Sequence, residues 1–309
     1  MNNLIKKNIF KIFLLLILIL SFWLRFYQLG ENPPSLDWDE ASLGYNAYSI
    51  LKTGADEYGS KFPISIRSFD DYKPPLYVYL SVPSVALFGL NEFGVRFPAA
   101  VIGFFTVIAI YFLVKEILSG WEEDKKEKIA LLSAFFLGVS PWHLQFSRAA
   151  FEGNIGLFFF LLGFLFFLKT LNDTKWIIFS VLAFVLSIYS YHSFRLVIPI
   201  FAFATLVIFR KEIWRLRKSF TLAILTGIIL ITPVFLSLVS DSQTGARLSM
   251  VSSFSSPDIL KQSIKDIEYD KSKGLSVLSI FHNRRIVYFL TTAKGYFDHW
   301  NPDFLFLHG

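Results

Sequence analysis

The stretch LYVYLSVPSVALFGL, Leu76–Leu90, decides how this chain is arranged. It is apolar enough to enter a membrane, yet as a helix it would reach only about 22 Å, less than the roughly 30 Å of a bilayer's hydrocarbon core. If the stretch crosses the membrane, every later loop changes sides. The sequence on either side of it must therefore settle which arrangement holds.

Seven further apolar runs flank this stretch. The chain has 309 residues, of which 54% are hydrophobic and only 17% are charged, too few for the polar shell of a soluble domain of this size. In lipid, the backbone satisfies its hydrogen bonds within helices. We therefore predict an all-α polytopic membrane protein with about seven spans, at Ile9–Leu24, Phe97–Val114, Ile129–Leu144, Ile155–Leu168, Trp176–Tyr191, Leu196–Phe209 and Phe220–Val239.

The basic residues lie in clusters between these runs. Cytoplasmic loops carry an excess of Lys and Arg, and this bias accounts for the net charge of +6 without a nucleic-acid partner. If Leu76–Leu90 does not cross, all clusters share the side of the N-terminus; if it crosses, all but the first lie outside. The clusters contain Lys6 and Lys7; Lys115, Lys125, Lys126 and Lys128; Lys169 and Lys175; and Arg210, Lys211, Arg215, Arg217 and Lys218.

The charge bias therefore predicts that Leu76–Leu90 is an interfacial or re-entrant helix in a first outer loop, residues 30–96. The protein would then lie in the plasma membrane with its N-terminus in the cytoplasm. The segments that reach the outer face would include Pro141–Asn154 and Tyr191–Arg195. We expect residues 1–239 to form the transmembrane module. Residues 240–309 are more polar and should form an extracytoplasmic segment with a helix around Ser279–Tyr296.

Acidic residues open a helical pattern directly after the first span. Asp37 followed by Glu40 three residues later is typical of a capping box, and Gly54 is a plausible end of the helix. Spacing alone favours this structural interpretation. Asp39 is not needed for the cap, however, and a carboxylate held beside the membrane could serve as a general base. The apolar face of the helix is expected to carry Leu43, Ala47, Ile50 and Leu51.

Basic side chains follow in the same loop. Lys73, in the segment Asp70-Asp71-Tyr72-Lys73-Pro74-Pro75, is either a snorkelling lysine or an ammonium that meets a phosphate at headgroup height. Arg96 opens the second span, where an interface anchor is the plain interpretation. The sequence leaves both alternatives for Lys73 open.

Two later outer segments are also polar. His143 stands in a segment that suits a membrane-interface belt, and Arg148 and Glu152 could form an i, i+4 pair on one helix face. Ionisable groups that enter a membrane are costly, so a cluster of them indicates a functional site. The second segment contributes Tyr189, Tyr191, His192 and Arg195. The chain has no cysteine, and its five histidines show no metal-ligand spacing.

Taken in order, these motifs resemble the bacterial relatives of the dolichyl-phosphate-mannose–protein mannosyltransferases, including the aminoarabinose transferases that modify lipid A. The resemblance rests on an N-terminal span, Asp39-Glu40, Lys73-Pro74-Pro75-Leu76, Phe88-Gly89 with Phe93 and Arg96, and Ser140-Pro141-Trp142 leading to Ser147-Arg148 and Glu152. It implies a GT-C-type helix bundle and a sugar donor linked to polyprenyl phosphate. The acceptor would be a hydroxyl of a protein, a lipid or a glycan.

The resemblance also implies roles for residues. Asp39 matches the expected base, Lys73 matches a position near the donor phosphate, and Glu152 falls where relatives carry a second acid. One base with direct displacement predicts inversion at the anomeric carbon. We therefore expect Asp39, Glu40 and Glu152 to be catalytic, Lys73, Arg96 and Arg148 to bind the phosphate, and Tyr72, His143, Asn154, Tyr191, His192 and Arg195 to line the substrate pocket.

Two other functions compete with this interpretation. A transporter or flippase of a lipid-linked sugar would place charges near mid-membrane, whereas here they gather at the outer ends of helices. An inactive scaffold of the same fold is the second alternative. Relatives are usually longer, and the ending Phe304–Gly309 resembles the middle of a motif, so we expect an N-terminal fragment. The sequence indicates no cofactor and leaves the sugar and any need for a divalent cation open.

Overall fold

The computed structural model describes residues 3–69, 71–240, 257–274 and 280–304. The chain divides into two compact units, Met1–Ser240 and Asp241–Gly309. Asp70 and the end of the chain after Phe304 lie outside the described residues.

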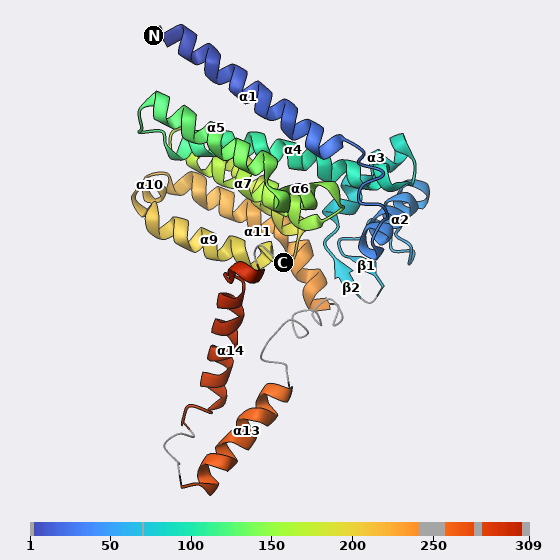
Figure 1. Cartoon of the computed structure of the whole chain (residues 1–309), viewed down its shortest axis with the longest axis vertical. Coiled ribbons are helices and arrows are strands. Elements are labelled where there is room, and N and C mark those ends of the chain that lie inside the picture. The colour runs from blue at the N-terminus through green and yellow to red at the C-terminus, as the bar shows by residue number, and fades with distance from the viewer. Residues whose placement is uncertain (1–2, 70, 241–256, 275–279, 305–309) are drawn as a thin grey trace. The chain divides into compact units, whose positions relative to one another are not determined.

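The first unit is a bundle of helices that run side by side (Figure 1). Four of them are long and apolar enough to cross a membrane: α1 (Asn3–Phe26), α4 (Glu92–Ile117), α7 (Glu152–Thr170) and α11 (Arg217–Ser240). A fifth crossing is possible if α5 (Glu123–Val139) and α6 (Pro141–Arg148), which meet at a bend of 57°, count as one span. The helical, polytopic architecture predicted from the sequence is confirmed.

The remaining two predicted spans are short helices. The helices α8 (Trp176–Ser190) and α9 (Phe194–Ile208) have 15 residues each, or roughly 22 Å of helix. The short α10 (Arg210–Arg215) connects α9 to α11. Within the described residues, the length criterion therefore supports four or five spans, fewer than the seven apolar runs suggest.

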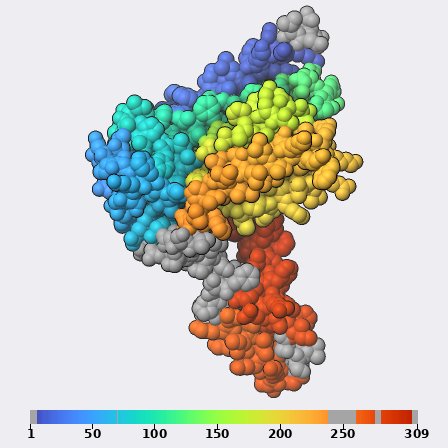
Figure 2. All heavy atoms as spheres, turned by 180° about the vertical axis from the view of Figure 1, so that it is seen from behind, coloured from blue at the N-terminus to red at the C-terminus, as the bar shows by residue number. Residues whose placement is uncertain are grey.

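The first loop stays at one end of the bundle. It contains α2 (Trp38–Thr53), β1 (Ile66–Ser68), β2 (Asp71–Lys73) and α3 (Leu76–Phe88), which form one mass in both views (Figures 1 and 2). The stretch that decides the topology thus forms a 13-residue helix, roughly 20 Å long and shorter than the hydrocarbon core of a bilayer. At the opposite end, Lys6 pairs with Asp124, which places the N-terminus beside the connection between α4 and α5.

A two-stranded antiparallel sheet adds to the expected helices. Ile66 pairs with Lys73 and Arg67 pairs with Tyr72 across β1 and β2. Each strand has only three residues, too few for an alternating pattern to stand out in the sequence. The hairpin is important because it fixes the position of Lys73.

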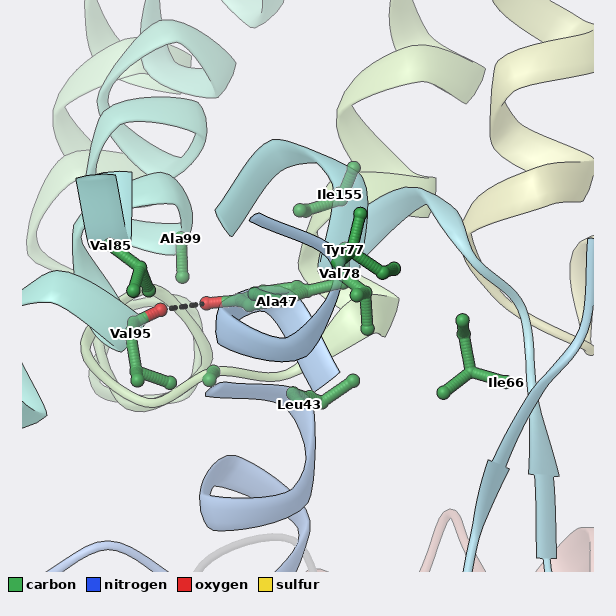
Figure 3. Close-up of a cluster of buried hydrophobic side chains, with 11 residues drawn as sticks. Leu43, Ala47, Ile66, Tyr77, Val78, Val85, Val95, Ala99 and Ile155 are labelled. Atoms are coloured by element: carbon green, nitrogen blue, oxygen red, sulfur yellow. Dashed lines mark hydrogen bonds between the residues drawn. The ribbon is translucent and has the colours of Figure 1, made fainter. Parts of the chain in front are cut away.

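A buried cluster attaches α2 to α3 and α4 (Figure 3). Leu43, Ala47 and Ile50 face this cluster as predicted, whereas Leu51 is 38% exposed, because it lies one residue further round the helix. A Cβ on Gly44 would lie 2.4 Å from Val95 Cγ2, so glycine permits the close approach of α2 to α4. Together these contacts hold the start of α2 in place.

In the second unit, α13 (Pro257–Ser272) packs against α14 (Arg284–Asp298). Asn283 caps α14, so this helix starts later than the predicted Ser279, which lies outside the described residues. The two helices are also joined through His282, whose Nδ1 lies 2.8 Å from Asp270 Oδ2 and whose carbonyl accepts a hydrogen bond from Ser263.

Candidate functional site

The start of α2 has the predicted capping box. The Glu40 N–H donates to Asp37 Oδ1 at 2.8 Å, and the Asp37 N–H donates to Glu40 Oε2 at 3.2 Å. Gly54 ends the helix in the left-handed conformation (φ 72°). Since the cap occupies Asp37 and Glu40, Asp39 is the acid of the first turn that is left outside it.

Lys73 lies between two carboxylates. Its Nζ is 2.8 Å from Asp39 Oδ2 and 3.7 Å from Glu152 Oε1. The lysine side chain is only 6% exposed, which excludes the snorkelling alternative, whereas the Asp39 side chain is 41% exposed. A buried ammonium needs such partners to offset its lost hydration. The structure thus brings together Asp39, Lys73 and Glu152, which we call the lysine cluster.

The strand that carries Lys73 is also held by a contact with the turn between α8 and α9. His192, in the turn between α8 and α9, has its Nε2 2.8 Å from the Tyr72 carbonyl oxygen. Because a carbonyl only accepts, this nitrogen donates. Tyr72 and His192 therefore support the position of Lys73 through the backbone.

Glu40 and Arg96 form a second ion pair, which is fully buried. Arg96 donates from Nε and Nη2 to the two carboxylate oxygens of Glu40, at 2.9 and 3.0 Å. Its other N–H groups donate to the carbonyl oxygens of Leu29, Pro33 and Ser35. All five N–H groups of the guanidinium are thus used, and none is left for a phosphate in this structure.

Arg148 also binds backbone carbonyls. It donates to Leu24 O at 2.7 Å, to Asn32 O at 2.8 Å and to Gln28 O at 3.4 Å, around the C-terminal end of α1. The proposed i, i+4 pairing with Glu152 on one helix is wrong. The helix α6 ends at Arg148, Ala149 is extended, and Glu152 begins α7.

A cavity of about 490 Å³ opens beside the lysine cluster. Glu152 belongs to both, because it contacts Lys73 and also lines the cavity. The predicted pocket residues His143, Asn154 and Tyr191 line it too. The rest of the wall is mostly apolar: Leu137, Ser140, Trp142, Phe146, Phe151, Gly153 and Leu157. Such a wall suits a ligand with an apolar body and a few polar groups.

Arg195 stands at the start of α9 and, like Tyr72 and His192, is not among the residues that line this cavity. Within the described part of the chain, no three His, Asp or Glu side chains gather as metal ligands would. Burial raises the pKa of the Tyr77 phenol well above its ordinary value, and the nearby carboxylates of Glu40 and Glu152 raise it further.

Arg25 was missed in the sequence. It is fully buried at the end of α1, where it donates to Ser21 Oγ at 2.8 Å and to Gly138 O at 3.1 Å. Its Nη2 lies 2.7 Å from His143 Nδ1. The signal that could have found it is a lone arginine that ends an apolar run, where a charge is costly.

Comparison with known proteins matches parts of this sequence to a protein family and to one relative. A family model described as dolichyl-phosphate-mannose-protein mannosyltransferase matches residues 72–236, which include Lys73, Glu152 and the cavity. Asp39 and Glu40 precede the matched region. An uncharacterized protein of Aquifex aeolicus is 32% identical over 126 residues, which make up 41% of this chain and 23% of that protein. No solved structure matches.

Proposed function

Because this chain belongs to the dolichyl-phosphate-mannose-protein mannosyltransferase family, we propose that it transfers a sugar from a polyprenyl-phosphate donor to an acceptor hydroxyl, with inversion. Family membership supports a membrane glycosyltransferase. The observation that carries the finer proposal is the lysine cluster. In it, a buried ammonium contacts one exposed carboxylate and a second carboxylate that lines a largely apolar cavity.

In the proposed reaction, Asp39 is the base. The exposed carboxylate takes the proton of the acceptor hydroxyl as its oxygen bonds to the anomeric carbon. The bond between that carbon and the phosphate oxygen breaks, and polyprenyl phosphate leaves with the electron pair. As Asp39 takes this proton and loses its charge, the ammonium of Lys73 would offset the charge that grows on the phosphate.

Glu152 is proposed to orient Lys73. A retaining reaction would need a second carboxylate that attacks the sugar, whereas Glu152 is 9% exposed and contacts the ammonium. Glu40 and Arg96 are proposed to support the start of α2, because their polar groups bind one another and the backbone. Arg148 is proposed to secure the end of α1.

We propose that the end of the bundle that carries the lysine cluster is extracytoplasmic, in a GT-C-type module of residues 1–239, with residues 240–309 on the same side. The positive-inside bias supports this orientation. The chain has no cysteine, so a single introduced cysteine reports one position. We expect Lys125→Cys to react with an impermeant maleimide only after the membrane is opened. Reaction in intact cells would contradict the proposed topology, because the site would then lie on the cytoplasmic face.

The test of the mechanism is Asp39→Asn, with Asp37→Asn as its matched control. Asparagine caps a helix as well as aspartate does, so the control keeps α2 intact. We expect Asp39→Asn to lower the rate of sugar transfer by about 10²- to 10⁴-fold, and the control to leave it within about twofold. Unaffected transfer in Asp39→Asn would exclude Asp39 as the base. The product's anomeric configuration, read by NMR, tests inversion.

A further inference from the structure

Two residues that line the cavity each carry a buried polar atom that lacks a partner among the described residues. The two atoms are His143 Nε2 and Asn154 Oδ1, two of the five such side-chain atoms in the described part of the chain, and both residues line the same cavity. A polar atom shielded from water and left unpaired costs free energy, so its presence in a native fold needs an explanation. A ligand bound in the cavity is one such explanation.

The contact with Arg25 fixes which atom of His143 carries a proton. Arg25 Nη2 lies 2.7 Å from His143 Nδ1, and a guanidinium can only donate. Nδ1 must therefore accept, and the single proton of the neutral imidazole is on Nε2. Ser147 does not alter this, because its hydroxyl donates to the His143 carbonyl oxygen at 2.5 Å. The unpaired Nε2 of His143 is consequently a donor.

A backbone carbonyl fixes Asn154 in the same way. Its side chain lies 3.0 Å from Ala99 O, and a carbonyl oxygen only accepts, so the amide nitrogen must face it. The amide oxygen is then turned away and remains an acceptor without a partner. Two residues of the cavity wall thus carry one fixed donor and one fixed acceptor.

We propose that His143 and Asn154 recognise hydroxyl groups of the donor's sugar, the former donating to one hydroxyl and the latter accepting from another. This inference rests on the proposed function and names the sugar subsite within it. A hydroxyl both donates and accepts, which a phosphate does not, and the acceptors Asn154 Oδ1 and Glu152 would disfavour a phosphate here. Aromatic rings of Trp142, Phe146 and Phe151 offer apolar faces to the sugar's C–H groups.

Arg25 is a positioning residue in this proposal. Because it acts on the sugar only through His143, its role is tested through that residue. His143→Asn keeps an acceptor near the former Nδ1 and loses the donor at Nε2. His143→Gln carries an amide nitrogen out to about the position of Nε2. The two variants therefore separate the structural contact with Arg25 from the contact with substrate.

The kinetic experiment compares polyprenyl-phosphomannose with its monodeoxy analogues. We expect the wild-type chain to lose about 10- to 100-fold in kcat/KM with the analogue that lacks the contacted hydroxyl. In His143→Asn this preference should fall toward one, and His143→Gln should keep part of it. A purely structural role would lower kcat/KM equally for all sugars and leave the preference intact, which would overturn the proposal.

A binding experiment keeps the inference separable from the proposed function. In Phe146→Cys, the introduced cysteine lines the cavity, and in Phe62→Cys it lines a different apolar cavity between the first loop, α8 and α11. We expect polyprenyl phosphate carrying mannose, glucose or galactose to slow maleimide labelling of the cysteine at position 146 more than bare polyprenyl phosphate does. The cysteine at position 62 should show no such difference.

The outcomes separate cleanly. Sugar-dependent protection without any sugar transfer supports the subsite and contradicts the proposed function. Transfer without sugar-dependent protection supports the proposed function and overturns the subsite. If neither is seen with any of the three sugars, both are overturned.

Discussion

Asp39 and Glu40 are consecutive in the sequence, yet their carboxylates lie in different environments. The Glu40 side chain is 4% exposed and accepts hydrogen bonds from Arg96, from the Ala150 N–H and from the Asp37 N–H. The Asp39 side chain is 41% exposed and contacts Lys73. One acid is enclosed by the protein, and the other is partly open to solvent.

The difference follows from helix geometry. Successive residues on a helix point about 100° apart, so a cap that fixes the register also fixes which acid turns inward. The capping box directs Glu40 to Arg96 and leaves Asp39 beside Lys73. An Asp-Glu motif in a sequence can therefore combine one buried and one exposed carboxylate, and mutations should separate their roles.

The largest expected effect on stability is that of Glu40→Gln. It leaves the buried charge of Arg96 without a carboxylate, and breaking a buried pair in this way costs about 3–5 kcal/mol. Unfolding in detergent, followed by circular dichroism, measures the loss. Asp39→Asn is the matched control and should cost less than about 1 kcal/mol, because its pair is partly exposed. Equal losses would mean that the two acids share one structural role.

Lys73→Gln should affect catalysis most among the basic residues. Removing the ammonium takes away the group that offsets charge on the leaving phosphate, and we expect kcat to fall by about 10²- to 10³-fold. Lys73→Arg, which keeps the charge, should recover part of the rate. If Lys73→Gln lowered the melting temperature but left kcat unchanged, the lysine cluster would be structural like the Glu40–Arg96 pair.

Arg148→Gln tests a smaller effect. The arginine donates to three carbonyl oxygens around the end of α1, so we expect a loss of about 2 kcal/mol in unfolding free energy and no change in KM for the donor. Steady-state kinetics measures KM for the donor, and thermal unfolding measures the loss of stability. A several-fold rise in KM without loss of stability would instead restore the phosphate-binding role that the motif suggested.

Local signals in the sequence were sufficient for much of this arrangement. The box between Asp37 and Glu40 and the end of α2 at Gly54 involve residues within one helix, whose spacing can be read directly. That Leu76–Leu90 does not cross stays a prediction from the charge clusters, and the 13 residues of α3 agree with it. The bend between α5 and α6 was not predicted, although Pro141 marks the start of α6.

Partners that are distant in the sequence could not be predicted. Arg96 and Glu40 are 56 residues apart, and Arg25 and His143 are 118 residues apart, so no local pattern shows that they meet. The family resemblance suggested a phosphate ligand for Arg96, and Arg25 went unnoticed. The tertiary fold decides whether a basic residue near a membrane surface is free to bind a ligand or is already occupied.

The smallest expected effect is that of Tyr77→Phe, in the cluster that holds α2 against α3 and α4. The Tyr77 hydroxyl donates to Val95 O at 2.9 Å (Figure 3), and its raised pKa keeps it protonated as a donor. Removing it takes one of two hydrogen bonds from a buried helix carbonyl, which should cost about 1 kcal/mol and lower the melting temperature while kcat stays within twofold.

Tyr79→Phe is the control, because its hydroxyl makes the same kind of bond to Pro63 O in a less buried place and should cost less. A fall in kcat for Tyr77→Phe beyond its loss of stability would show that the contact between α3 and α4 also tunes the lysine cluster. The packing of α3 would then affect the proposed reaction at Asp39 and not only the stability of the fold.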